Sequence, residues 1–339
     1  MTSTKKGNKL DAFKSLPLVK TIGFNRVVLI GVIFLLYAFF AVLSPVLHNG
    51  TNFVSYERIM SALNYCYFIG FLGLGVTFVI ATGGIDFSIG SVMFCAALIS
   101  GYCLTKFNVP LLPCLIISVL VGTLFGSVGG YLVAYVHLPS FITSMALMLI
   151  AKGVGSIFTK TQSVSWPNLS SGENVWFRYF VKWNNIPVGI ILLILAAIIC
   201  AVILTKTKAG RYMVCLGSNK EAVRLSGVDV RKWEMLAYVI CGTLAGIAAI
   251  FYVGAYTTVQ PGLGDTFNND AIAACVMGGT SMAGGSASIL GTVIGAVIVA
   301  LVQEGILAMG FNINYQYVLT GLIVLGAVTA DIMSRKRKN

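Results

Sequence analysis

Charged residues are scarce in this chain of 339 residues, and acidic residues are the scarcest of them. Only 10% of the residues are charged, against about 25% in a soluble domain, and Lys and Arg outnumber Asp and Glu by 23 to 11. Long polar stretches are equally few, because 57% of the residues are hydrophobic. The composition therefore excludes an ordinary soluble domain and indicates an integral membrane protein.

Sequence signatures of catalysis and of metal binding are also missing. No G-x-x-x-x-G-K-[ST] loop occurs, so the chain is not expected to bind ATP in that way. The two histidines carry no HExxH zinc motif and no Ser/His/Asp set. The eight cysteines are scattered without a CxxC pair, which indicates neither a disulfide framework nor a metal site. We therefore expect no catalytic residue, no metal and no cofactor in this chain, and a membrane enzyme is disfavoured.

Apolar segments that approach the length of a membrane span occupy most of the chain. A transmembrane helix needs about 20 mostly apolar residues. Ten segments approach this pattern: Val27–Leu47, Ala62–Thr82, Ser88–Leu104, Leu111–Val136, Phe141–Thr159, Val188–Leu204, Met235–Ala255, Ala271–Ala283, Ile289–Met309 and Tyr317–Ile332. The eighth is short and rich in glycine, so it either spans the membrane or re-enters it. We predict an all-α, polytopic bundle of about ten transmembrane helices.

Basic residues gather in three polar segments. Residues 1–26, the segment Thr205–Glu234 (the polar island) and the C-terminal tail 333–339 together hold 17 of the 23 Lys and Arg residues. With an even number of spans all three lie on one side, which the positive-inside rule makes cytoplasmic. The prediction is one transmembrane domain over residues 27–332 with both termini in the cytoplasm. Topology then accounts for the net charge of +12 without a nucleic-acid partner.

The polar island contains a short segment with helix-capping residues at both ends. Ser218 is followed three residues later by Glu221, the pattern of a capping box, and Gly227 can take the left-handed conformation that ends a helix. A two-turn helix is too short to be stable alone in water, so a soluble partner is expected to pack on it. The predicted coupling helix comprises Ser218, Asn219, Glu221, Ala222, Arg224, Leu225, Ser226 and Gly227.

Two glycine-rich segments, one in each half of the chain, share the pattern GG-x5-GS at a separation of 195 residues. One begins at Gly83-Gly84 and the other at Gly278-Gly279. Glycine doublets within apolar segments are typical of broken helices or of close helix approach. Paired interruptions indicate a transport pathway between two internal repeats. We therefore predict that these four glycines line or hinge a translocation path, with chance similarity of small residues as the alternative.

Four ionisable residues, Asp86, Lys152, Asp270 and Glu304, interrupt the apolar segments. Each should face protein or water, because an unpaired charge in a bilayer is costly. We expect Asp86 to accept backbone N–H groups after the first glycine doublet, or to act in gating or solute contact. Asp270 either belongs to the path or caps a helix, and Lys152 and Glu304 could form an ion pair. These charges do not form a proton relay, although an ion-coupled secondary transporter stays open.

The longest loop outside the polar island, Lys160–Pro187, contains three tryptophans, Trp166, Trp176 and Trp183. Tryptophan is enriched at membrane–water interfaces. An interfacial belt is therefore the first interpretation of this loop, and a contact surface for an external protein is the second.

Several segments resemble, in order, those of the ribose-type sugar permeases, the membrane subunits of ABC importers. Gly75–Ser91 resembles the family's GMTxVIxxGGIDLSVGS segment, and Thr207–Val228 resembles TxxGRxxYAxGGNxxAAxLSGI. Asp270–Gly285 is similar to DAIAAVVxGGTSxxGG, and Pro139–Thr143 fits xPAFIxTL. Two positions depart from the family: Asn268 replaces a usual acidic residue, and Ser218 replaces a glycine.

The resemblance implies a subunit of about ten helices in a bacterial cytoplasmic membrane, in contact with membrane lipid. It implies a second permease copy or a close paralogue, an ABC ATPase subunit that carries ATP and Mg²⁺, and an extracytoplasmic sugar-binding protein that delivers a monosaccharide such as ribose or galactose. Related families with similar cores carry branched-chain amino acids or nucleosides, and a sugar-like signal molecule is a further alternative. The resemblance does not identify the solute, nor does it distinguish a homodimer from a heterodimer.

Overall fold

The computed structural model describes residues 24–47, 52–167, 174–184, 186–312 and 314–336. Almost all of the predicted tail 1–26 and residues 337–339 of the predicted basic tail therefore lie outside the described residues. The elements are α3 (Phe24–Leu47), α4 (Tyr56–Ala81), α5 (Ile89–Lys106), α6 (Leu111–Ala134), α7 (Ser140–Phe158), β1 (Val164–Ser165), the 3₁₀ helix η1 (Val175–Phe180), α8 (Val188–Lys206), α9 (Lys208–Ser218), α10 (Lys220–Leu225), α11 (Val230–Ala255), β2 (Thr258–Val259), α12 (Thr266–Met277), α13 (Ile289–Ala308) and α14 (Asn314–Lys336).

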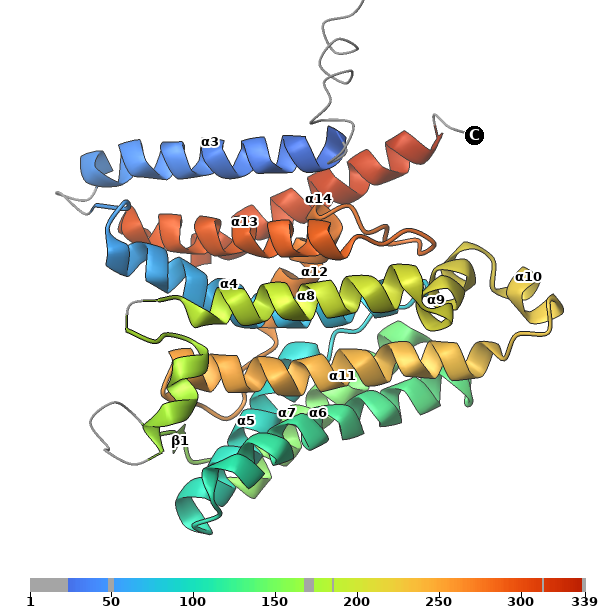
Figure 1. The fold of residues 1–339 in the computed structure, drawn as a ribbon, viewed down its shortest axis with the longest axis horizontal. Coiled ribbons are helices and arrows are strands. Elements are labelled where there is room, and N and C mark those ends of the chain that lie inside the picture. Colours follow the sequence, from blue (N-terminus) through green and yellow to red (C-terminus); the bar gives the residue numbers. More distant parts are fainter. Residues whose placement is uncertain (1–23, 48–51, 168–173, 185, 313, 337–339) are drawn as a thin grey trace, which may run out of the picture.

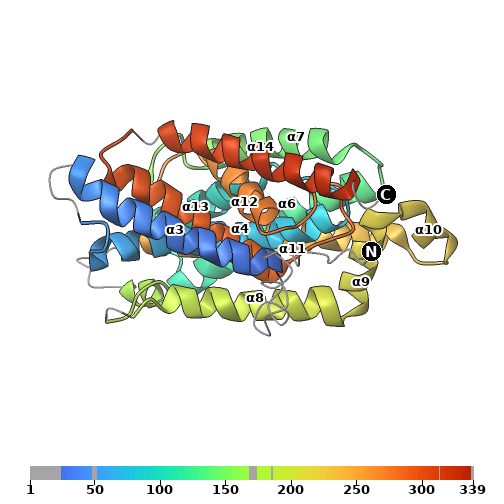
Figure 2. The same cartoon turned by 90° about the horizontal axis from the view of Figure 1, so that it is seen from above.

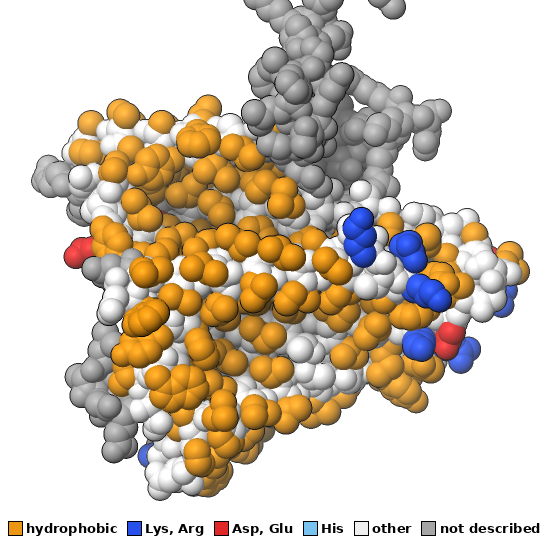
Figure 3. All heavy atoms as spheres, in the orientation of Figure 1, with side chains coloured by type: hydrophobic (Ala, Val, Ile, Leu, Met, Phe, Trp, Pro, Cys, Tyr) orange, Lys and Arg blue, Asp and Glu red, His pale blue; other side chains and the backbone are white. Residues whose placement is uncertain are grey.

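The long helices run roughly side by side, and the two-residue strands β1 and β2 pair antiparallel at the edge (Figure 1). Helix α4 forms the centre: it is buried along most of its length and contacts α11, α13 and α12. Helices α6 and α8 are buried over only part of their length, and many of their apolar side chains are exposed. Hydrophobic side chains accordingly cover the face shown in Figure 3. An exposed apolar belt around a buried centre is the arrangement of a polytopic membrane protein, as the sequence predicts.

Eight of the described helices are long and apolar enough to cross a membrane. They match the first seven predicted spans and the ninth. The predicted total of ten is not confirmed, because α12 has only 12 residues and α14 is not among the eight. Helix α14 also continues to Lys336, four residues beyond the predicted span.

The polar island lies at one end of the bundle. The first residues of α3 and the last residues of α14 lie towards this same end (Figures 1 and 2). Lysine and arginine side chains gather there in the space-filling view (Figure 3). The polar island and the described helix ends that border the other two basic segments therefore lie at one end of the molecule.

Candidate translocation site and coupling segment

The predicted coupling helix forms, but its cap differs from the predicted capping box. Asn219 is the N-cap of α10, and its side-chain oxygen accepts the Ala222 amide at 2.9 Å. Ser218 instead ends α9 and donates its hydroxyl to the Val214 carbonyl at 3.3 Å. The capping-box prediction was wrong because α9 continues through Ser218, so the first residue free to cap the next helix is Asn219.

The side chain of Glu221 takes no part in capping. Arg224 donates two hydrogen bonds to its carboxylate, at 2.9 and 2.6 Å, and these bonds lower the pKa of Glu221. Gly227 does adopt the predicted left-handed conformation, with φ of +80°. It follows directly after the C-cap residue Ser226, which is the usual place for such a glycine.

A small hydrophobic cluster holds α10 against its neighbours. Val223 of α10 packs with Leu216 of α9 and Val230 of α11. Lys220 and Glu234 form an ion pair across the same helices, with the lysine Nζ 2.7 Å from the nearer carboxylate oxygen. The remaining surface of α10 is exposed, and the Leu225 side chain is 74% exposed. Helix α10 is thus already formed in the isolated chain, and its outer face is exposed.

Both glycine doublets break helices, as predicted. After α4 the Gly84 amide donates to the Val79 carbonyl at 3.2 Å, and after α12 the Thr280 amide donates to the Cys275 carbonyl at 3.2 Å. Each bond spans five residues, and the residue before each donor is left-handed: φ is +86° at Gly83 and +89° at Gly279. These are two Schellman-type helix ends of the same form.

The structural correspondence between the two breaks differs by one residue from the sequence pattern. Gly83 corresponds to Gly279, a separation of 196 residues rather than 195. The GG-x5-GS pattern pairs Gly83 with Gly278, which here is the C-cap of α12. Matching glycines by sequence alone therefore aligns the two breaks one residue out of register, because only the left-handed position requires glycine.

The two breaks touch each other and the end of α9 through backbone atoms. The Gly285 amide donates to the Ala81 carbonyl at 3.2 Å. A Cβ atom on Gly217 would come closer than 3.0 Å to both of these groups, and one on Gly284 would lie 2.8 Å from the Gly83 nitrogen. We call Gly83, Gly217, Gly284 and Gly285 the glycine junction. It joins the last turn of α9 to the ends of both broken segments.

The other two predicted glycines are needed for close packing. A Cβ on Gly84 would lie 2.5 Å from the Tyr238 hydroxyl, and one on Gly278 would overlap the backbone of Gly291. By contrast, a Cβ on Gly279 would meet nothing within 4 Å, so that position is restricted by its backbone conformation alone. Sequence reasoning identified the doublets but could not assign these separate causes.

Asp86 supports the first break in the way that the sequence predicts. It is 4% exposed, and its Oδ1 accepts the Ser88 amide at 2.8 Å and the Ser88 hydroxyl at 2.6 Å. These bonds turn the chain into α5, which begins at Ile89. A neighbouring bond from the Gly90 amide to the side-chain oxygen of Asn268, at 2.6 Å, ties the same turn to α12. Asn268 thus serves as a hydrogen-bond acceptor that joins α12 to the start of α5.

Asp270 lies within α12, so the interpretation of Asp270 as an N-cap was wrong. The helix begins at Thr266, five residues before the predicted segment Ala271–Ala283. The carboxylate of Asp270 accepts the Tyr65 hydroxyl and, at 3.1 Å, the side-chain amide of Gln316. Tyr65, Asp270 and Gln316 are all buried. The three residues form a hydrogen-bonded cluster that joins α4, α12 and α14.

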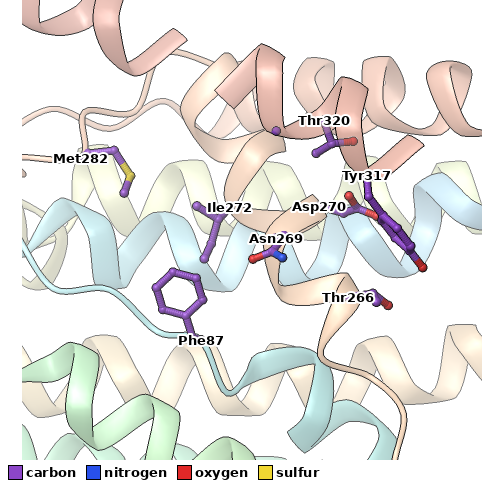
Figure 4. Close-up of a pocket in the computed structure, with 9 residues that line it drawn as sticks. Phe87, Thr266, Asn269, Asp270, Ile272, Met282, Tyr317 and Thr320 are labelled. Atoms are coloured by element: carbon purple, nitrogen blue, oxygen red, sulfur yellow. The ribbon is translucent and has the colours of Figure 1, made fainter. Parts of the chain in front are cut away.

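A cavity of about 410 Å³, here called the central cavity, lies between both breaks, α12 and α14. Phe87 of the first break and Met282 of the second lie at one end, and Asp270 and Tyr317 lie towards the other (Figure 4). Its lining is mostly apolar, with polar groups concentrated on α12 and α14. Such a cavity has the size and character of a small-molecule site. Of the predicted path residues, only Asp270 lines it directly; Asp86 and the glycines shape its walls.

The remaining intramembrane charges pair differently from the ion pair that the sequence allowed. Lys152 lies 3.1 Å from Asp265 at the start of α12. Glu304 accepts from Arg58 at 2.8 Å and from the Ser61 hydroxyl at 2.8 Å. Lys152 and Glu304 are therefore not partners of each other. Both pairs fasten helix ends, which is a structural use of charge.

The tryptophan-rich loop divides into two parts. Trp166 is buried and donates its indole N–H to the Ala97 carbonyl at 3.2 Å, so it belongs to the core rather than to the interfacial belt that the sequence predicts. Trp176 and Trp183 are exposed, as an interfacial position or an external contact requires. The sequence of the loop does not distinguish Trp166 from the other two tryptophans, because the hydrogen-bond partner of Trp166, Ala97, belongs to the distant helix α5.

An apolar bundle with two helix breaks beside a cavity is an arrangement typical of membrane permeases. Residues 58–328 match the family described as "Branched-chain amino acid transport system / permease component". The chain belongs to this family, and the resemblance to ribose-type permeases is confirmed. It is a transport component and not an enzyme.

Three curated relatives illustrate the similarity. The ribose import permease protein RbsC of Escherichia coli (strain K12) is 32% identical over 87% of this chain and 90% of the relative. The fructose import permease protein FrcC of Rhizobium meliloti is 29% identical over 85% and 81%. The xylose transport system permease protein XylH of Escherichia coli (strain K12) is 28% identical over 84% and 87%. No solved structure matches the chain.

Proposed function

We propose that the chain is the membrane-spanning subunit of an ATP-driven importer that moves a monosaccharide across a bacterial cytoplasmic membrane. The observation that carries the proposal is the central cavity, to which both broken segments contribute residues. A cavity bounded by two movable breaks can open alternately to either side. The names of the curated relatives, which import ribose, fructose and xylose, support a sugar as the solute.

The proposed energy source is a separate ATPase subunit that binds ATP and Mg²⁺ and docks on α10. The helix is capped, pre-formed and exposed, and basic side chains surround it. We place the end of the bundle that carries α10 in the cytoplasm, together with both chain termini, by the positive-inside rule. An extracytoplasmic binding protein would deliver the solute at the opposite end. A second permease copy or a paralogue would complete the assembly.

The glycine junction supplies a mechanical route from the ATPase to the cavity. The N-cap of α10, Asn219, is two residues from Gly217, which lies against the Ala81 carbonyl and the Gly285 amide. A displacement of α9 would therefore press on both breaks at once. Where backbone packs directly on backbone, no side chain can change rotamer to absorb a displacement. The movement of one element is therefore passed directly to the other.

The lining of the central cavity favours a neutral solute. Among the described residues that line it, Asp270 is the only charged one, and its carboxylate is already bonded to Tyr65 and Gln316. A zwitterionic amino acid would need a cation for its carboxylate. A branched-chain amino acid therefore fits this lining less well than a sugar, and a nucleoside or a sugar-like signal molecule is the closer alternative.

Reconstitution tests the proposed function. The purified chain, assembled with its ATPase in liposomes and supplied with binding protein, should import radiolabelled ribose, fructose or xylose only when ATP is present at the α10 side. The chain alone should import none of them under a proton or sodium gradient. Gradient-driven transport without ATPase would establish a secondary transporter instead.

A further inference from the structure

A second cavity of about 210 Å³ lies beside the central cavity. Six aromatic side chains line it: Tyr65, Phe68, Tyr252, Tyr256, Phe267 and Tyr317. Several of their rings contact each other, with centroids 5.3 Å apart for Phe68 and Tyr252 and 5.1 Å apart for Tyr252 and Tyr256. We call it the aromatic cavity. Because the rings pack on each other, the walls of the aromatic cavity are rigid. They present both flat aromatic faces and tyrosine hydroxyls to the cavity.

The two cavities adjoin. Thr266 and Tyr317 line both of them. Asp270 lines the central cavity, whereas its hydrogen-bond partners Tyr65 and Gln316 line the aromatic cavity. The buried cluster of these three residues thus forms the wall between the cavities.

The order of the cavities along the bundle follows from the helices that line them. The aromatic cavity takes residues from α4, from the C-terminal parts of α11 and α13, and from the first turns of α12 and α14. The ends of α11 and α13 and the start of α14 lie at the end of the bundle away from α10, whereas α12 lies near the middle (Figure 1). The central cavity takes residues from the two breaks next to the glycine junction. A solute that enters at the end away from α10 meets the aromatic cavity first.

One polar atom in the aromatic cavity has no protein partner. Among the described residues, none bonds to the buried Oε1 of Gln303, although Gln303 lines the cavity. An unsatisfied buried acceptor destabilises the folded state. If Gln303 had no ligand to bind, replacing it with leucine would leave the fold equally stable or make it more stable. The amide is therefore available for a solute hydroxyl.

We infer that the aromatic cavity is an entry site for a neutral polyhydroxylated ring, and this inference rests on the proposed function. The apolar C–H face of a sugar packs on an aromatic ring, and its hydroxyls donate to Gln303 Oε1 and exchange hydrogen bonds with Gln316 and the phenols. Among the described residues that line this cavity, none carries a charge. A zwitterion would leave both of its charges unpaired there, which is costly in a buried site.

Two matched variants test the site. Gln303→Leu removes the unpaired acceptor, and Asn64→Leu removes another buried, unpaired amide oxygen, on α4, that lines neither cavity. The full chain is placed in lipid nanodiscs, and saturation-transfer NMR measures binding of ribose, fructose and xylose, with leucine as the zwitterionic probe. Thermal unfolding and ATP-driven uptake by the assembled transporter are measured in parallel.

We expect Gln303→Leu to weaken sugar binding about fivefold, the equivalent of one hydrogen bond, while its melting temperature stays equal or rises. Asn64→Leu should bind sugar as the unaltered chain does. Ring C–H protons of the sugar should receive the strongest saturation, and leucine should give no signal. Loss of stability in Gln303→Leu without loss of binding would overturn the inference.

The proposed function and the entry site are contradicted by different results. If the assembled transporter imports none of the three sugars, the proposed function fails regardless of Gln303. If it imports a sugar, but the nanodisc sample gives no sugar signal or both variants bind equally, the aromatic cavity is not a solute site and the proposed function stands.

Discussion

Gly217 is the residue at which the coupling hypothesis can be tested most directly. It lies in the last turn of α9, one residue before Ser218. A methyl group in the substitution Gly217→Ala would come closer than 3.0 Å to the Ala81 carbonyl oxygen and the Gly285 amide nitrogen. Both neighbours are backbone atoms, from two different segments. They cannot rotate away, so relief requires α9 to move off the breaks.

The expected size of this effect follows from overpacking in well-packed interiors, which typically costs about 1–3 kcal/mol. A bias of 1.4 kcal/mol is a tenfold change in a two-state equilibrium. We therefore expect Gly217→Ala to insert and fold while the number of sugar molecules imported per ATP hydrolysed falls about tenfold. ATP hydrolysis itself should continue, because the docking face of α10 is unchanged.

The assay is proteoliposome uptake measured together with phosphate release. Gly153→Ala is the matched control, since Gly153 is also helical but a Cβ there would meet nothing within 4 Å. It should retain the normal ratio of uptake to hydrolysis. A normal ratio in Gly217→Ala, with thermal unfolding unchanged, would refute the role of the glycine junction in coupling.

Three further substitutions test other contacts. Asn219→Ala should weaken capture of the ATPase by about 1 kcal/mol, the usual loss of an N-cap, whereas Ser218→Ala should not; equal defects in a pull-down assay would contradict the observed cap. Gly278→Leu should abolish uptake in protein that still reaches the membrane, because the side chain would overlap Gly291; normal uptake would mean that α12 and α13 can separate. Arg58→Ala leaves the buried Glu304 with Ser61 and should lower stability by up to about 3 kcal/mol; an unchanged melting temperature would show that the ion pair is dispensable.

Most of the helical layout could be predicted from the sequence, because apolar runs and bilayer thickness constrain it directly. The predicted start of the first span differs from α3 by three residues. Local rules failed where two of them competed. Ser218 and Asn219 are both good caps, and only the continuation of α9 through Ser218 decides between them. The start of α12 was missed for another reason: its first five residues are mostly polar, so the predicted apolar segment began only at Ala271.

The candidate site was only partly accessible to sequence reasoning. Asp270 stands out because it is a lone acid in an apolar segment, and the glycine doublets stand out by spacing. Gln303 and Gln316 carry no comparable signal, being uncharged. The aromatic cavity draws on five helices, so no local pattern brings its residues together. The pairing of Lys152 with Asp265 likewise depends on the meeting of α7 and α12.

The shortness of α12 has a consequence for electrical insulation. Twelve residues cover at most about 18 Å, whereas the hydrocarbon layer is about 30 Å thick. One end of the helix adjoins the partly exposed pair of Asp265 with Lys152, and the other is followed by the loop after Gly278. Where water reaches both ends of α12, the membrane voltage falls over a barrier thinner than the bilayer. A neutral sugar does no work against that steeper field, whereas an ion crossing it would bear the full electrical and desolvation cost.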